Sequence, residues 1–344
     1  MPLQGDDIAD LVALTQRDLG RMNWTEIATD LQEYVALPQI LRKERVRFGS
    51  GYGIQWQVML THSGAAKTTG LYAVDSVNVG DVMTNANIPW RHITTNYAIE
   101  RREVAMNRNP ARIVELVKVR RSDAMISLAV LMETQFWNKP ADSTDASSIF
   151  GVPYWIVSNA TTGFNGGNAA GFTGGPGGID RTVATNSRWK NYTGRYVNIS
   201  VSDLVVKWRA AATKTKFMSP TPIPDYNTGN RYGYYTNYDV IGEMESALES
   251  RNSNLGNDLA VKDGRVVFRQ VPIHWVPYLD DNTTDPVYGI NWGVFKPVFL
   301  AGEYLNESRP QRAANQHTVL QTHVDLTCNI ECRDPRRCFV LDKA

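Results

Sequence analysis

The sequence predicts an α+β subunit of elongated shape, and three stretches of periodic hydrophobicity carry this prediction. From residue 45 to about 103, apolar and polar residues alternate with the period of two that is typical of strands. From Pro110 to Trp137 apolar residues recur at helical spacing, and from His317 to Cys332 the alternation returns. At about 1.5 Å per helical residue and 3.3 Å per strand residue, the last two elements would be about 42 Å and 50 Å long. A compact chain of this length has a radius of gyration of about 20 Å, so these elements would cross most of the body.

The first forty residues contain two predicted short helices, the second of which begins near Asn23 and ends at Pro38. A strip of basic residues follows it, formed by Arg42, Lys43, Arg45 and Arg47. Beyond this strip, Ile54, Trp56 and Val58 alternate with glutamines, and residues 64–70 mark a turn. The span 49–87 is rich in Gly, Ser and Thr, which favours a long hairpin projecting from the body over a strand pair of the core.

The long helix is expected to begin with Asn109 as N-cap and Pro110 at its first position, where the missing N–H of proline costs nothing. Its first half is charged and its second half is apolar, so we expect only the second half to be fully packed. Further along, a helix capped by Ser202 and another beginning at Asp239 are predicted, and Asp263-Gly264 is a strong hairpin signal. The glycine-rich residues 163–178 lack a phosphate-binding pattern and are expected to form a mobile surface loop.

Composition excludes several classes of protein. The chain has 344 residues, of which 42% are hydrophobic and 21% are charged, as in an ordinary folded protein. Its 36 basic and 35 acidic residues give a net charge of +1, which argues against coating nucleic acid through bulk positive charge. Three cysteines near the C-terminus do not make a secreted disulfide framework. The longest apolar stretch, Met125–Met132, is too short to span a membrane, and the acidic N-terminus is unlike a signal peptide.

No motif predicts catalysis or a metal site, so we expect no enzyme, metal or cofactor. On one strand His317 and His323 share the polar face, whereas Cys328 and Cys332 share the apolar face, so the four cannot converge. The Asx-rich residues 280–285 are expected to satisfy their own backbone rather than hold calcium. The chain has no GxSxG or HExxH motif, although a carboxylate pair formed in space stays open.

Two basic strips are the candidate functional residues. For both strips we favour solvated charge or ion pairs between subunits over contact with phosphate. The strips consist of Arg42, Lys43, Arg45 and Arg47, and of Arg333, Arg336 and Arg337.

The C-terminal part of the chain resembles a known family. Val271–Asp281 (VPIHWVPYLDD), Pro286–Leu305 (PVYGINWGVFKPVFLAGEYL) and Thr322–Leu341 (THVDLTCNIECRDPRRCFVL) resemble the closing strands of tailed-phage major capsid proteins. Phe150–Ile156 (FGVPYWI), just after the long helix, resembles the same family, and so does the order of the elements along nearly the whole chain. The resemblance implies the Hong Kong 97-type capsid fold.

By this resemblance the chain has five parts. They are an N-terminal arm at 1–48, an E-loop hairpin at 49–87, the P-domain strand and spine helix at 88–140, the A domain at 141–300, and the C-terminal P-domain strands at 301–344. The implied function is a major capsid protein that assembles as hexamers and pentamers into an icosahedral shell around double-stranded DNA, which it does not read by sequence. The basic strips would then lie between subunits or face the DNA.

The resemblance also implies partners and a location. We expect a separate scaffolding protein, a portal, and in some assemblies a cement or decoration protein. The protein would be made in the host bacterial cytoplasm and end in the virion. Some relatives cross-link an E-loop lysine, but nothing around Lys67 marks a reactive lysine, so no cross-link is expected.

Two other functions compete with this one. An encapsulin-type nanocompartment shell would share the fold and enclose a protein cargo. A monomeric carbohydrate-active or carbohydrate-binding β-rich protein would use the nine Trp and fifteen Tyr residues as a sugar platform. The aromatic residues are scattered through strand and helix patterns, so packing in the core and at interfaces is the better interpretation.

Overall fold

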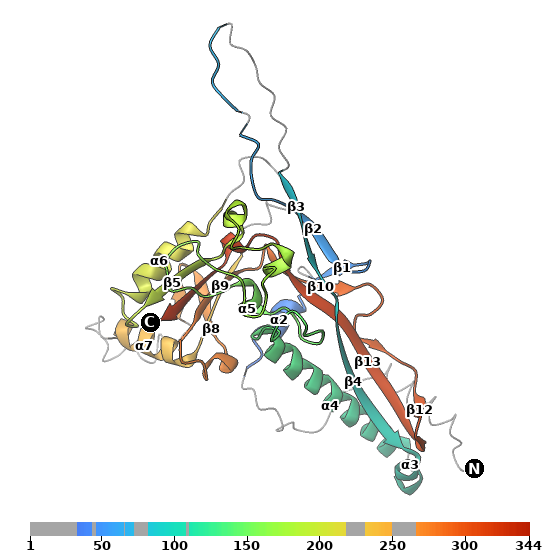
Figure 1. The fold of residues 1–344 in the computed structure, drawn as a ribbon. Coiled ribbons are helices and arrows are strands. Elements are labelled where there is room, and N and C mark those ends of the chain that lie inside the picture. The colour runs from blue at the N-terminus through green and yellow to red at the C-terminus, as the bar shows by residue number, and fades with distance from the viewer. Residues whose placement is uncertain are drawn as a thin grey trace.

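The computed structural model describes residues 33–42, 46–64, 66–71, 82–107, 110–217, 231–249 and 266–344. These residues form an elongated subunit with one sheet and a long helix at one end, a second sheet with two helices at the other, and a hairpin that projects from between them (Figure 1). The predicted hairpin at Asp263-Gly264, the N-cap Asn109 and most of the two N-terminal helices lie outside the described residues.

The first sheet is organised around one long strand, β13 (Gln316–Cys332). Strand β4 (Arg91–Glu100) pairs antiparallel with it from Val319↔Glu100 to Cys328↔Arg91. Its other edge pairs with three short strands in turn. These are β12 (Gln311–Ala313), β11 (Asn306–Glu307) and β10 (Phe295–Leu300), and β1 (Arg47–Gly49) pairs with β10. The predicted long strand is therefore confirmed.

Helix α4 (Pro110–Phe136) follows the short helix α3 (Arg101–Asn107) and lies along this sheet, which confirms the predicted long helix (Figure 1). The expectation that only its second half packs is wrong. Ile113 and Val117 in the first half are fully buried against residues of β4 and β13. The charges of the first half lie beside this apolar contact, where the Arg120 Nη2 atom is 2.8 Å from a Glu103 carboxylate oxygen.

The second sheet has the strand order β5-β14-β9-β6-β8-β7. The strands are β5 (Tyr192–Tyr196), β14 (Phe339–Lys343), β9 (Val287–Asn291), β6 (Tyr232–Thr236), β8 (Val271–Trp275) and β7 (Val267–Phe268). Helices α6 (Leu204–Lys214) and α7 (Tyr238–Glu249) pack on it through Trp208 and Val240, both completely buried. Both helices were predicted, but the residue before α6 is Asp203 and not Ser202.

Two details of the predicted division are changed by the sheet topology. Strand β10 precedes residue 300 but pairs with β13, whereas β14 follows it and pairs with β5 and β9. A boundary at residues 300/301 therefore coincides with no sheet boundary, because backbone pairing exchanges segments between the two ends of the molecule.

Pro38 lies inside the short helix α2 (Leu37–Ile40) rather than ending a helix, since proline is tolerated in a first turn.

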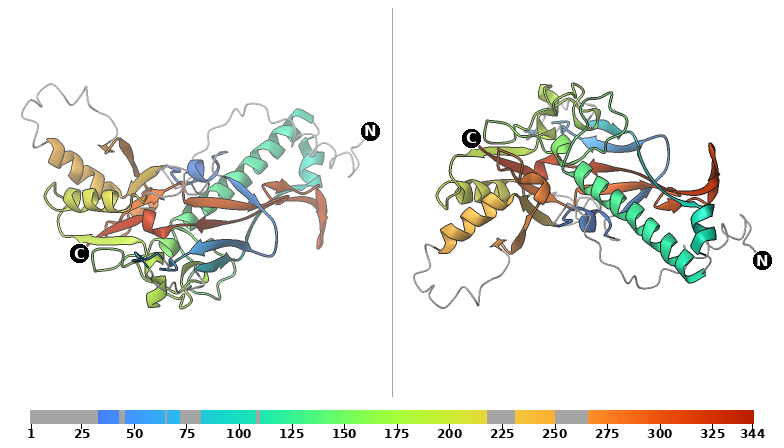
Figure 2. Two further views of the ribbon diagram at one scale, coloured as in Figure 1. Left: turned by 90° about the horizontal axis from the view of Figure 1, so that it is seen from above. Right: turned by 90° about the horizontal axis from the view of Figure 1, so that it is seen from below.

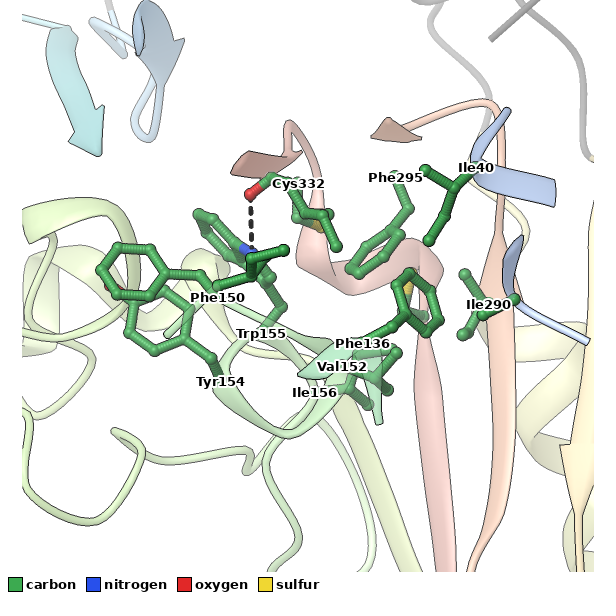
Figure 3. Close-up of a cluster of buried hydrophobic side chains, with 14 of the residues drawn as sticks. Ile40, Phe136, Phe150, Val152, Tyr154, Trp155, Ile156, Ile290, Phe295 and Cys332 are labelled. Atoms are coloured by element: carbon green, nitrogen blue, oxygen red, sulfur yellow. Dashed lines mark hydrogen bonds between the residues drawn. The ribbon is translucent and has the colours of Figure 1, made fainter. Parts of the chain in front are cut away.

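The largest apolar cluster joins the two sheets. Phe136 at the end of α4 stacks on Trp292 at a ring distance of 5.9 Å and meets Phe295 edge-on at 6.0 Å (Figure 3). The short helix α5 (Val152–Trp155) packs beside it, and the Trp155 indole N–H donates to the Ile330 carbonyl at 3.0 Å. On the predicted polar face of β13, Asn329 is buried against this part of the chain and accepts the Phe150 N–H, and Thr327 and Glu331 are buried as well.

The glycine-rich residues 163–178 were expected to be a mobile surface loop, and that expectation is wrong about their position. Ala169, Phe172 and Ile179 are buried, and the 3-10 helix η1 (Pro176–Gly178) packs into the large cluster. Three further 3-10 turns are η2 (Ala184–Trp189), η4 (Pro277–Leu279) and η5 (Pro335–Arg337).

Candidate functional site

The projecting hairpin is formed by β2 (Ile54–Met59), β3 (Met83–Ile88) and the described residues between them (Figure 1). The strands pair antiparallel from Ile54↔Ile88 to Met59↔Met83, and among the described strands they pair with no other. On β2 Ile54, Trp56 and Val58 are buried, as the alternation predicted, and the residues between and after them are exposed. The base of the hairpin, including the buried Leu60, is therefore part of the core, whereas its described length beyond Leu60 leaves the body.

The base of the hairpin is fixed by specific contacts. The Trp56 ring lies 6.0 Å from the Trp155 ring, and the Trp90 indole N–H donates to the Gly51 carbonyl at 3.0 Å. Ala86 on β3 is fully buried, and a Cβ on Gly177 would lie 3.4 Å from the Ala86 Cβ. Gly177 has φ +69°, a conformation that favours glycine, so this turn can bring its backbone against the hairpin.

Large apolar side chains are exposed along and beside the hairpin. Tyr52 and Leu71 are 105% and 91% exposed, and Phe48 and Met59 are 61% and 56% exposed. Single exposed apolar residues are common, but Met59 and Leu71 lie on the projecting hairpin and Phe48 and Tyr52 lie on the chain just before it, and exposed apolar side chains on a projecting element suit contact with another protein. The candidate functional site is this hairpin surface.

The backbone N–H groups of residues 35–37 are bound by one buried carboxylate, that of Glu133. Glu133 on α4 is 2% exposed, and its oxygens accept hydrogen bonds from the backbone N–H groups of Val35, Ala36 and Leu37 at 3.1, 2.9 and 2.8 Å. It also accepts the Trp137 indole N–H at 2.9 Å. The segment that follows the first 32 residues is thus anchored to the C-terminal part of the long helix.

The two predicted basic strips meet at one carboxylate. Arg47 Nη1 and Arg333 Nε lie 3.3 and 3.1 Å from the same oxygen of Glu331, which is 3% exposed. The two arginines together stabilise the Glu331 carboxylate better than either would alone, because all three charges are partly removed from water. Arg42 is exposed, and Lys43 and Arg45 lie outside the described residues.

The other two arginines of the second strip, Arg336 and Arg337, contact groups within the subunit. Asp334 receives Arg336 Nε at 2.9 Å, and the Arg336 guanidinium lies 4.5 Å from the centre of the Phe217 ring. Arg337 is 1% exposed and donates to the Phe217 carbonyl at 2.9 Å. The hypothesis that Arg337 lies between subunits or faces DNA is therefore wrong, because folding within the subunit buries its guanidinium.

Sequence reasoning missed a buried arginine just after the glycine-rich segment, Arg181. Arg181 donates to the Trp155 and Gly167 carbonyls, both at 2.9 Å, and to the Asn191 side-chain oxygen at 3.2 Å. Burial lowers its pKa to about 10. It crosslinks α5 to the glycine-rich segment by hydrogen bonds to neutral groups. No spacing in the sequence marks such a residue, since its partners are mostly backbone carbonyls.

The residues of β13 and of 280–285, which were not expected to bind a metal ion, lie apart or have other partners in the structure. The two histidines of β13 are exposed, whereas Cys328 and Cys332 are buried, and burial raises the pKa of Cys328 to about 12. Asp280 accepts the Trp275 indole N–H and the Tyr238 N–H, and Asp285 pairs with Lys343 at 2.7 Å. Within the described ranges, no three His, Cys, Asp or Glu residues are grouped to hold a metal ion. Among the helices that the structure describes, none combines the length and hydrophobicity that a membrane crossing requires.

Known structures resemble this subunit over nearly its whole length. A chain of the cyanophage A-1(L) capsid asymmetric unit superposes with a TM-score of 0.64 at 15% identity, covering 94% of this chain and 96% of that one. A chain from the capsid of the native GTA particle gives 0.54 at 12% identity, covering 95% of each chain. The capsid of cyanophage P-SCSP1u gives 0.50 at 12% identity, covering 96% of this chain and 94% of that one.

The similarity is visible in structure and not in sequence. No protein-family model and no curated protein matches the sequence. The structural match covers 94% and 95% of this chain in the first two structures, and it confirms the Hong Kong 97-type capsid fold predicted from the sequence.

Proposed function

We propose that the protein is the major capsid protein of a tailed phage, which assembles as hexamers and pentamers into an icosahedral shell around double-stranded DNA. The observation that carries the proposal is the fold match to phage capsid chains over 94% of this chain. A match of this coverage leaves little of the chain unaligned. The subunit also has a hairpin that projects from its body, and such an element serves a protein that contacts its neighbours better than one that stays a monomer.

The surface of the subunit supports an assembling role. The hairpin exposes Met59 and Leu71, and Tyr52 is exposed just before it. Burying such side chains against a neighbouring copy would contribute about 25 cal/mol per Å² of apolar surface. Each such contact is weak by itself, but a closed shell repeats it many times. In this proposal residues 49–87 form the E-loop that lies over a neighbour, and residues 1–48 form the arm.

The remaining parts of the proposal concern its partners and chemistry. The P domain comprises residues 88–140 and 301–344, and the A domain comprises residues 141–300, with β10 and β14 exchanged between their sheets. The protein is structural rather than catalytic. It works with a separate scaffolding protein, a portal and, in some assemblies, a decoration protein, and it resides in the virion after synthesis in the host bacterial cytoplasm. Its DNA contacts are independent of sequence, and Arg42, Lys43, Arg45, Arg47, Arg333 and Arg336 are the candidate residues.

The test is assembly of the recombinant chain, alone and co-expressed with the scaffolding protein from the same genome. Negative-stain electron microscopy and size-exclusion chromatography should show rings and closed shells. A variant that lacks residues 64–70 should fold, as judged by circular dichroism, and yet form far fewer shells. A uniform 38.5 kDa monomer under both conditions would overturn the proposal. Shells that enclose an enzyme instead of DNA would identify a nanocompartment.

A further inference from the structure

Four of the strands of the second sheet run in the same direction. Strands β5 and β14 are parallel, β6 and β8 are parallel, and β9 is antiparallel to both β14 and β6. Strands β5, β14, β6 and β8 therefore all begin at one end of the sheet and finish at the other. Helices α6 and α7 lie side by side on this sheet (Figure 2). The two ends of this unit differ in charge.

The end where the strands begin is basic. Tyr232 at the start of β6 donates its hydroxyl to the Thr215 carbonyl at 2.9 Å, which places the C-terminal end of α6 there. Arg269, just before β8, donates to the Thr213 hydroxyl at 2.9 Å. The exposed basic residues at this end, which we call the basic end, are Lys214, Lys216, Arg231 and Arg269, and we include Arg209, which precedes them at the middle of α6.

The end where the strands finish is acidic. The Tyr238 N–H at the start of α7 donates to Asp280 at 2.8 Å, which joins α7 to η4. Lys343 at the end of β14 pairs with Asp285 at 2.7 Å, and the field of Glu243 and Asp239 adds to that of Asp285 in raising the pKa of Lys343. The exposed carboxylates of this end, which we call the acidic end, belong to Asp239, Glu243, Asp280 and Asp281.

Helix dipoles account for only part of this separation. An acidic residue in the first turn of α7 and a basic residue in the last turn of α6 stabilise their own helices, which explains Asp239 and Lys214. Lys216 and Arg269 lie close to the C-terminal end of α6 and share in this stabilisation, whereas Arg231 and Asp281 lie outside both helices. Like charges gathered at each end repel one another within a subunit, so the pattern favours a partner of opposite sign.

We propose that the basic end of one copy of this chain docks on the acidic end of the next copy. This inference rests on the proposed function and specifies which surfaces meet within a ring. A contact between two different surfaces is heterologous, and copies joined head to tail close into a ring when the rotation between neighbours allows. The occupant of each end is therefore a second copy of the same chain, oriented by charge complementarity.

Charge reversal at exposed residues tests the pairing. The variant R209E/K216E/R231E gives the basic end a net negative charge and so makes both ends acidic, and D239N/E243K/D281K gives the acidic end a net positive charge and so makes both ends basic. Each variant should keep the wild-type circular dichroism spectrum and melting temperature, since these side chains are exposed. The yield of rings and shells should fall about tenfold or more for each variant, because like-charged ends then meet. The combined variant, which carries all six substitutions, should recover assembly because its two ends again have opposite signs.

Mixing the two variants gives a sharper result. Every junction in a ring of alternating variants joins an acidic end to a basic end, so the mixture should form rings. Alternation is possible only around an even number of subunits, so six-membered rings should return and five-membered rings should not. Mass spectrometry of isolated rings would measure both the number of subunits and their composition.

Two outcomes separate this inference from the proposed function. If the wild-type chain forms shells and the two reversed variants form them equally well, the pairing of the ends is wrong and the capsid role stands. If the wild-type chain forms no rings or shells even with its scaffolding protein, the proposed function itself fails. Loss in both variants without recovery in the combined variant or the mixture would also overturn the pairing.

Discussion

The Glu133 carboxylate accepts a hydrogen bond from the Ala36 N–H at 2.9 Å, although the two residues are 97 positions apart. The same carboxylate oxygen also accepts the Val35 N–H and the Trp137 indole N–H, and the other oxygen accepts the Leu37 N–H. Glu133 therefore anchors residues 35–37 to the C-terminal part of α4. The four donors satisfy a carboxylate that is almost completely removed from water.

Replacing Glu133 should weaken the attachment of residues 35–37 to α4. The variant E133A leaves four donors without their acceptor, and we expect the free energy of unfolding to fall by about 3 kcal/mol. E133Q keeps an oxygen for three of the donors, so its loss should be about half as large. Denaturant unfolding measures the difference, and hydrogen exchange should show the loss of protection first at residues 35–37. An E133A variant as stable as the wild type would contradict the assigned anchor.

The base of the hairpin should behave as core although the hairpin projects. Trp56 is 8% exposed and packs on Trp155, so W56A should lower the free energy of unfolding by about 3 kcal/mol through the cavity it creates. The matched control is Q57A, one position along on the exposed face, which should change stability by less than about 0.5 kcal/mol. Equal effects of the two variants would show that the hairpin base is not seated in the core.

Gly151 is required by the close approach of two helices. A Cβ at this position would lie 2.1 Å from the Asn138 carbonyl oxygen and 2.4 Å from that of Phe136, at the C-terminal end of α4. G151A should therefore lower the free energy of unfolding by about 2–3 kcal/mol, since one helix must move. G167A is the control, because nothing lies within 4 Å of its added Cβ. Thermal melts of both variants compare them, and a wild-type melting temperature for G151A would refute the contact.

Stability should depend on pH through Asp342. This residue is 6% exposed, accepts a hydrogen bond from the Ser158 hydroxyl, and burial raises its pKa to about 6 from an ordinary value of 3.8, against the opposing effect of Arg195. A raised pKa means that the folded state binds the proton more tightly than the unfolded state. The stabilisation is therefore complete below about pH 4 and is lost as the pH rises through 6.

The variant D342N imitates the protonated carboxyl and isolates this effect. At pH 7 it should be more stable than the wild type by up to about 3 kcal/mol, the equivalent of two pKa units. At pH 4 the two proteins should unfold at nearly the same denaturant concentration. A gain of the same size at both pH values would show that the effect does not come from titration of Asp342.

Periodicity predicted those elements that are long and amphipathic. Helix α4 begins at the predicted Pro110, and β13 differs from its predicted start by one residue, because many residues contribute to each pattern. The same reasoning failed for the polar face of β13, where Asn329 accepts the Phe150 N–H at 3.1 Å. The alternation of a strand shows which residues share a face, but not what covers that face.

The candidate site was predictable only in part. The hairpin followed from composition and alternation, whereas its seat on Trp155 and Gly177 depends on segments far apart in the chain. The two basic strips were found as charge runs, yet their convergence on Glu331 and the burial of Arg337 were not, since local sequence carries no information about a partner 284 residues away.

The sequence by itself determined the α+β class, the order of the elements, and the two long rods around which the subunit is built, since periodicity and turn residues act over a few neighbouring positions. Only the tertiary structure decided which charges are anchors and which are surface. Glu133, Glu331 and Arg181 are buried because distant backbone and side-chain groups replace the water that each would otherwise keep, and that replacement exists only after the chain has folded.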